Sequence, residues 1–228
     1  MTHEEKHFAG SQIVRDIVIG MSDGLTVPFA LAAGLTGAVQ NNTIIVTAGL
    51  AEIVAGSIAM GLGGYLAGKT EIEHYDAELT REYDEVERFP EQEKKEVREI
   101  FENYGLSRES ATLVTDELAK DRHKWVSFMM QFELGLDKPD INRARQSALT
   151  IGLSYIAGGI VPLLPYFFTE FPSSGFRYSC VITIICLFFF GYFKSKAIGQ
   201  KPLPGAVRIT LIGALAAASA YYVAHLIN

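Results

Sequence analysis

Pairs of glutamates three residues apart are the first feature of this sequence that could do chemistry. Glu82 and Glu85 form one pair, and Glu93 and Glu96 form another. Residues three apart lie on the same face of a helix, where like charges repel one another. A divalent cation would compensate that repulsion, so the two pairs predict a metal-binding site.

A third group of candidate ligands lies in the stretch MMQFE, which contains Met129, Met130 and Glu133. Met129 and Glu133 are four residues apart and share a helix face. Carboxylate oxygens combined with a thioether suit a borderline transition metal better than Ca²⁺ or Mg²⁺. His74 and His123 are further candidate ligands. The alternative is a solvated acidic surface whose methionines fill a hydrophobic core.

Two other acids, Asp23 and Glu52, lie inside long apolar segments. An ionised carboxylate inside a membrane costs about 2.5–3.5 kcal/mol on insertion scales, so acids kept there usually serve a function. Spacings of four and eight place Glu52, Gly56 and Met60 along one side of a helix. The sequence thus predicts a pathway through the membrane, although acids satisfied within a helix bundle are the alternative.

The depths of these three side chains follow from the helical rise. At about 1.5 Å per residue, Asp23 lies roughly 12 Å from the helix end at Arg15, and Met60 roughly 13 Å from the same side at Lys69. Glu52 lies roughly 12 Å further across. Asp23 and Met60 are therefore predicted at one depth, with Glu52 beyond them.

Five apolar segments are long enough to carry these residues across a membrane, since a span needs about 20 mostly apolar residues. They are 16–39, 44–68, 148–168, 178–193 and 207–227. Small residues on the first two predict close helix packing of the kind often found in dimers. These are Gly20 and Gly24 in the first, and Ala55, Ala59, Gly63 and Ala67 in the second.

An acidic segment separates the second and third spans. Residues 70–135 contain 18 acidic and 9 basic side chains, in a chain of net charge −6. The second span is expected to continue into this segment as a helix. Pro90 precedes a second helix over 91–103 that Gly105 ends, and Ser107 caps a third over 108–134.

The prediction is an all-α membrane protein with five transmembrane helices and a three-helix cytosolic domain inserted between helices two and three. Its predicted parts are 1–69, 70–142 and 143–228. Lysines and arginines gather on one side of the spans, which predicts a cytosolic N-terminus and acidic segment and a C-terminus on the other side. The residues concerned are Lys6, Arg15, Lys69, Arg143, Arg145, Lys194, Lys196, Lys201 and Arg208.

Two stretches resemble the vacuolar iron transporter family of plants, fungi and parasites: RDIVIGMSDGLTVPFALAAGL and AEIVAGSIAMGLGGYLA. The plant-type members, with an acidic insert, are the most similar. The resemblance implies a homodimer in the vacuolar membrane that moves Fe²⁺ from the cytosol in exchange for protons. It implies Asp23, Glu52 and Met60 as transport residues. The implied ligands of the cytosolic metal-binding domain are Glu82, Glu85, Glu93, Glu96 and Glu133, with Met129 and Met130.

Other functions remain to be compared with iron transport. A transporter of Mn²⁺ or Zn²⁺ would use the same ligand types, and Co²⁺ is another surrogate. A non-transporting metal sensor would need the spans only as anchors. No phosphate loop, nucleophile set or zinc motif suggests an enzyme, and no prosthetic group is expected. The acidic soluble part argues against nucleic-acid binding, which leaves lipid, metal ions, protons and a second copy as expected partners.

Overall fold

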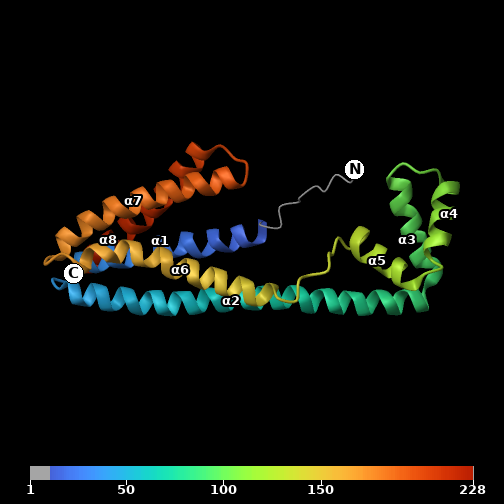
Figure 1. The fold of residues 1–228 in the computed structure, drawn as a ribbon, viewed down its shortest axis with the longest axis horizontal. Coiled ribbons are helices and arrows are strands. Elements are labelled where there is room, and N and C mark those ends of the chain that lie inside the picture. Colours follow the sequence, from blue (N-terminus) through green and yellow to red (C-terminus); the bar gives the residue numbers. More distant parts are fainter. Residues whose placement is uncertain (1–10, 228) are drawn as a thin grey trace, which may run out of the picture. The chain divides into compact units, whose positions relative to one another are not determined.

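The structure, a computed structural model, describes residues 11–227, and within them the chain forms eight helices and no strand (Figure 1). Five helices are long and apolar enough to cross a membrane, and each corresponds to a predicted span. They are α1 (Ser11–Ala38), α2 (Asn42–Arg88), α6 (Arg143–Phe167), α7 (Pro172–Ala197) and α8 (Pro202–Ile227). The other three are α3 (Pro90–Asn103), α4 (Arg108–Leu118) and α5 (Arg122–Phe132).

The chain divides into two compact units. The larger unit contains the described residues up to Leu66 and from Ala144 onward, and the smaller unit is Ala67–Arg143. Helix α2 contributes to both, because it runs without a break over 47 residues. The expected continuation of the second span as a helix is therefore confirmed.

Helices α1 and α6 pack backbone against backbone within the larger unit. A Cβ atom on Gly20 would lie 2.2 Å from the carbonyl oxygen of Ile151, and one on Gly24 would lie 2.3 Å from that of Tyr155. From α6, a Cβ on Gly158 would come within 2.9 Å of the Leu25 nitrogen. Gly20 and Gly24 thus serve packing inside the chain, not the contact between copies suggested by their spacing.

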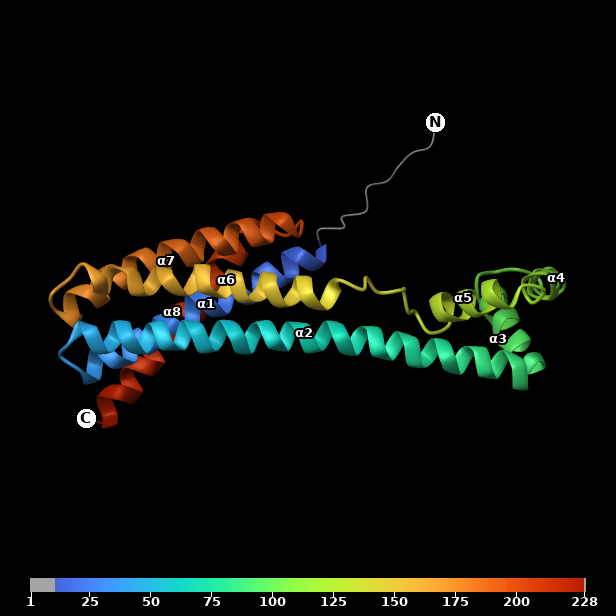
Figure 2. The same ribbon diagram turned by 60° about the horizontal axis from the view of Figure 1, so that its bottom comes forward.

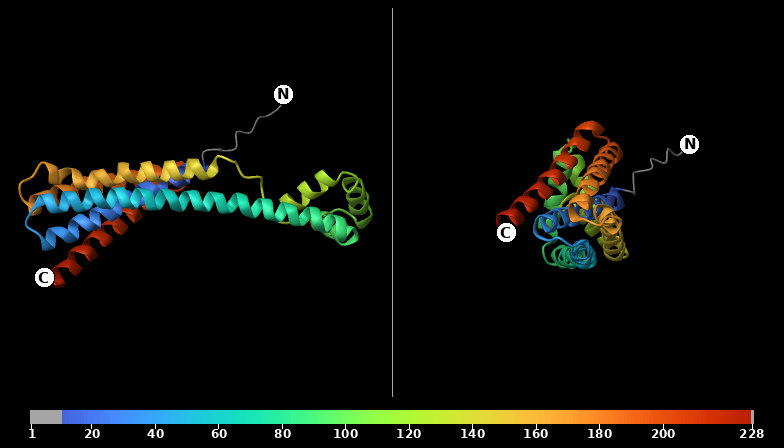
Figure 3. Two further views of the ribbon diagram at one scale, coloured as in Figure 1. Left: turned by 90° about the horizontal axis from the view of Figure 1, so that it is seen from below. Right: turned by 90° about the vertical axis from the view of Figure 1, so that its left-hand side faces the viewer.

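The apolar half of α2 runs alongside α6, as the views in Figures 2 and 3 both show. A Cβ on Gly61 of α2 would lie 3.0 Å from the carbonyl oxygen of Ala148. At the far end, the Asn42 amide donates to the backbone oxygen of Thr169 and, at 3.2 Å, to its hydroxyl. This contact ties the α1–α2 turn to the α6–α7 turn.

Most basic residues of the membrane helices lie at the other ends of those helices, whereas Arg177 lies near the start of α7. Arg143 and Arg145 begin α6, and Lys194 and Lys196 lie in the last turn of α7. The side of the membrane that they face stays a prediction. Lys6 and Asn228, which also bear on that prediction, lie outside the described residues.

The helix signals in the smaller unit are confirmed up to α4. Pro90 begins α3, and Gly105 follows its end with a φ of 96°, a backbone conformation that favours glycine. The Ser107 hydroxyl accepts a hydrogen bond from the Ser110 nitrogen at 3.2 Å and so caps α4. These local residues fix where the helices begin and end.

The prediction of one helix over 108–134 is wrong, because the chain forms α4 and α5 with a break between them. Asp121 is the reason: its carboxylate accepts hydrogen bonds from the backbone nitrogens of His123 and Lys124 and caps a new helix. The smaller unit therefore contains the end of α2 and three further helices, instead of three helical segments in all.

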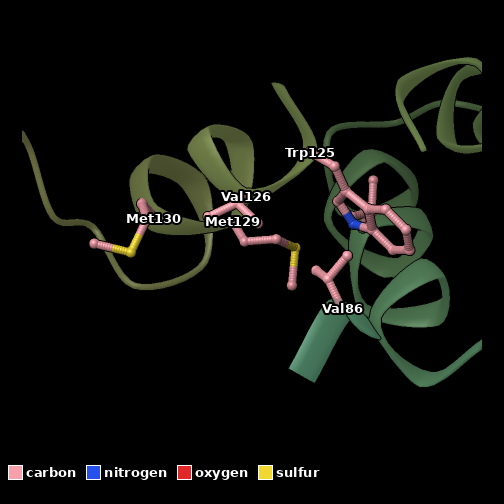
Figure 4. Packing of buried hydrophobic residues seen from close by; sticks show 6 residues of the cluster. Val86, Trp125, Val126, Met129 and Met130 are labelled. Atoms are coloured by element: carbon pink, nitrogen blue, oxygen red, sulfur yellow. The ribbon is translucent and has the colours of Figure 1, made fainter. Parts of the chain in front are cut away.

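The break lets α5 place its apolar side chains in the core of the smaller unit. Trp125 and Met129 pack with Val86 of α2 and Val97 of α3. Figure 4 shows the Met129 side chain extending toward Val86, with Trp125 beside it. The core therefore joins α2, α3 and α5, the three helices that also carry the predicted glutamate ligands.

Candidate metal-binding and transport sites

Five glutamates of the smaller unit come together from α2, α3 and the end of α5. In one group, carboxylate oxygens of Glu82, Glu85 and Glu93 all lie within 4.8 Å of one another. In a second group the same holds for Glu93, Glu96 and Glu133. Glu93 belongs to both, so the structure brings all five predicted carboxylate ligands into one glutamate cluster.

The centre of the glutamate cluster is buried. Glu82 is 1% exposed and Glu93 is 4% exposed. The Oε2 atom of Glu82 is buried and has no hydrogen-bond partner among the described residues. Carboxylates excluded from water are normally paired with a cation or coordinate a metal, so this geometry fits a bound divalent ion.

Arg81 supplies the nearest positive charge. Its guanidinium lies 3.9 Å from Glu82 and 3.5 Å from Glu85. It makes a shorter contact, 2.8 Å, with Glu78. One half-exposed guanidinium shared among three acids compensates the glutamate cluster only in part.

Burial and crowding change the proton affinity of the glutamate cluster. Burial is the main cause that raises the pKa of Glu93 from 4.5 to about 7, and the charges of Glu96 and Glu82 add to it. Burial followed by the charge of Glu96 also raises the pKa of Glu133 to about 7. The pKa of Glu82 is raised for the same reasons. Near neutral pH Glu93 and Glu133 are therefore only partly ionised in the absence of a cation.

The two methionines occupy the apolar core. Met129 is fully buried and Met130 is 2% exposed. Figure 4 shows that the two side chains leave α5 in different directions. A ligand role for these thioethers stays a prediction. Neither His74 nor His123 belongs to the two carboxylate groups, and His123 shares a 2.7 Å hydrogen bond with Tyr83.

Inside the larger unit, Glu52 of α2 meets Tyr155 of α6. The Tyr155 hydroxyl donates a hydrogen bond to Glu52 Oε1. Glu52 Oε2 is buried and has no hydrogen-bond partner among the described residues. Asp23 on α1 and Met60 on α2 are both half-buried. Asp23 directly precedes Gly24, the residue that packs on the backbone of Tyr155.

Comparison with known proteins assigns this arrangement to a family. A sequence model of the VIT family matches residues 14–225. The chain belongs to the VIT family. The matched range includes Asp23, Glu52 and the whole glutamate cluster.

Curated relatives of this VIT-family chain cover almost all of it. It is 51% identical to "Vacuolar iron transporter 1" of Oryza sativa subsp. japonica over 96% of this chain and 87% of that protein. It is also 51% identical to "Vacuolar iron transporter 1" of Arabidopsis thaliana, over 99% and 90%. "Protein CCC1" of Saccharomyces cerevisiae is 37% identical, over 95% and 70%.

Two residues of this VIT-family chain that contact the candidate carboxylate ligands, Tyr155 and Arg81, were not predicted from the sequence. Tyr155 could have been noticed as a hydroxyl inside an apolar span, but its partner is 103 residues away in the chain. Arg81 could have been noticed as the residue before the first glutamate pair. Residue spacing indicates possible ligands on one helix, but it does not indicate the groups that contact those ligands.

Proposed function

We propose that this chain is a membrane transporter, not an enzyme, and that it moves Fe²⁺ from the cytosol into the vacuole. The observation that carries the proposal is the near-full-length match to proteins named vacuolar iron transporter. That match is supported by five helices long enough to span a membrane and by acids within two of them.

The glutamate cluster collects Fe²⁺ from the cytosol, and the larger unit moves it. Asp23 and Met60 form the transport site on the cytosolic side. Glu52 receives the ion or carries protons further across. This assignment is supported by the burial of Glu82 and Glu93 in the glutamate cluster and by the buried oxygen of Glu52, which has no hydrogen-bond partner among the described residues. It requires the N-terminus and the smaller unit to be cytosolic and the C-terminus to face the vacuole.

Exchange with protons follows from the chemistry of the ligands. A carboxylate must be deprotonated to bind a metal, so protons and Fe²⁺ compete for the same oxygens. On the acidic side of the membrane, protons release the metal. On the neutral side, metal displaces protons. The pH gradient across a vacuolar membrane would therefore drive Fe²⁺ in one direction.

The transporter works as a homodimer, with α1 and α2 of each copy at the contact. Small side chains on α2 support this part of the proposal, because they leave room for another helix. A Cβ on Gly63 would meet nothing within 4 Å. The small residues of this α2 face are all exposed: Ala55, Ala59, Gly63 and Ala67.

Fe²⁺ uptake into proteoliposomes with an acidic interior tests the transport proposal. Wild-type protein is expected to take up Fe²⁺ only while the pH gradient is present. Asp23→Asn should abolish uptake, while metal binding by the glutamate cluster, measured by titration calorimetry, should be unchanged. Uptake that does not depend on the gradient would disprove exchange.

Competing metals separate the remaining alternatives. A Mn²⁺ or Zn²⁺ transporter would take up those ions in preference to Fe²⁺ in the same vesicles. A metal sensor would show no uptake of any of the three ions. The metal response of such a sensor would also be unchanged by Asp23→Asn or Glu52→Gln.

A further inference from the structure

Glu52 is held at one oxygen and free at the other. Oε1 accepts the hydrogen bond from the Tyr155 hydroxyl, whereas Oε2 is buried and has no hydrogen-bond partner among the described residues. Tyr155 itself is only 2% exposed, so water does not compete for its hydroxyl. The structure therefore leaves one oxygen of Glu52 for an ion or a proton.

Two glycines fix the position of Tyr155. On α2, a Cβ at Gly56 would lie 2.5 Å from both the Cζ atom and the hydroxyl oxygen of the Tyr155 ring. On α1, a Cβ at Gly24 would lie 2.3 Å from the Tyr155 carbonyl oxygen. The ring fits only because residue 56 has no side chain. Gly56 therefore makes room for the Tyr155 ring and does more than separate Glu52 from Met60.

The other surroundings of Glu52 carry little charge. Asp23 of α1 lies within electrostatic range of Tyr155. A groove of about 480 Å³ beside Glu52 is lined by α1 and by three alanines of α8, Ala216, Ala220 and Ala224. Among the described residues that line this groove, Glu52 is the only ionisable one. Among the described residues, the Tyr155 hydroxyl is thus the one hydrogen-bond partner of the Glu52 carboxylate.

We propose that Tyr155 is a positioning residue that holds Glu52 in one orientation, so that the second carboxylate oxygen stays available to the transported ion. The inference rests on the proposed role of Glu52 in transport. A hydrogen bond from an outer group orients a carboxylate that binds a metal. Such charge-assisted bonds are also among the stronger ones in proteins.

Tyr155→Phe tests this role, because it removes the hydroxyl and keeps the ring. The KM for Fe²⁺ uptake, measured at one pH gradient, is expected to rise about tenfold with little change in the maximal rate, which is the lower end of what outer partners of metal ligands contribute. Tyr166→Phe is the matched control. Tyr166 is also buried on α6, but its hydroxyl lies 2.9 Å from the neutral hydroxyl of Thr36, and its loss should leave the KM for Fe²⁺ unchanged.

A second test keeps Tyr155 but changes the position of its ring. Gly56→Ala forces the ring away and should give the same rise in KM, whereas Gly37→Ala on α1, whose added methyl would make an ordinary 3.5 Å contact, should not. Equal KM values for wild type, Tyr155→Phe and Gly56→Ala would overturn the inference. Absence of pH-driven uptake in wild type would instead count against the proposed transport, so the two failures are distinguishable.

Discussion

Glu82 of α2 and Glu93 of α3 have carboxylate oxygens within 4.8 Å of each other, although both side chains are almost excluded from water. Two negative charges this close together and this deeply buried are unfavourable in the absence of a cation or a proton. The relationship identifies the centre of the glutamate cluster and shows which substitutions will be most informative.

Glu93→Gln should weaken metal binding more than any other single change in the cluster, because Glu93 belongs to both carboxylate groups. We expect at least about a tenfold loss of affinity, the lower end of what even outer ligand partners contribute. Titration calorimetry with Mn²⁺ or Co²⁺ on the purified full chain measures it. Glu91→Gln, at an exposed position of the same helix, should bind as wild type does, and equal losses in both variants would refute the shared-ligand arrangement.

The stability of the metal-free smaller unit should decrease as the pH rises. The pKa of Glu93 is raised from 4.5 to about 7, so the folded state binds the proton more tightly than the unfolded state does. Its favourable contribution is complete below about pH 4.5 and is lost as the pH passes 7. Thermal unfolding followed by fluorescence isolates this unit, because Trp125 is the single tryptophan of the chain.

Two comparisons check the origin of that pH dependence. Glu93→Gln should flatten the decrease between pH 5 and pH 8. Addition of Mn²⁺ at pH 8 should restore stability, since an ion that binds only the folded state stabilises it. A melting temperature that rises with pH in the metal-free protein would contradict the assignment.

Asp121→Ala should destabilise α5 without changing the membrane helices. The Asp121 carboxylate accepts hydrogen bonds from two backbone nitrogens at the start of α5. Loss of such a cap costs about 1 kcal/mol, which for a unit of this size lowers the melting temperature by about 4–8 °C. The Trp125 fluorescence transition reports it, and Asp137→Ala, an exposed aspartate without a capping role, is the control.

Gly24→Ala should destabilise the larger unit, because its methyl group would lie 2.3 Å from a backbone oxygen of α6 that cannot move aside. Gly37→Ala on the same helix places its methyl 3.5 Å from a tyrosine ring, an ordinary contact. Thermal stability of the detergent-solubilised protein, followed by size-exclusion chromatography after heating, distinguishes the two. Similar stability of both variants would show that the α1–α6 crossing is looser than described.

Local sequence signals predicted the parts of the fold that depend on neighbouring residues. Hydropathy found the five spans, and Pro90, Gly105 and Ser107 marked helix boundaries that the structure confirms. The break before α5 was missed because Asp121 stands in a sequence otherwise favourable to helix. The burial of Trp125 against α2 and α3 favours the break, and that contact is not visible in local spacing.

Residue spacing predicted the glutamate cluster only as two separate pairs of glutamates. Spacing placed Glu82 with Glu85 and Glu93 with Glu96 on their own helices. Their burial depends on the packing of α2, α3 and α5, which spacing does not describe. Likewise Glu52 was recognised as an intramembrane acid, but its contact with Tyr155 depends on how α2 and α6 pack.

Close packing around α6 has a mechanical consequence. Where backbones touch, no layer of flexible side chains lies between two helices to absorb sliding or rotation. Gly20 and Gly24 bring α1 onto α6, and Gly61 brings α2 onto it. These three helices are therefore expected to move as one rigid body that keeps Glu52 and Tyr155 in register. Opening to alternate sides of the membrane would then require movement of the surrounding helices or of a second copy.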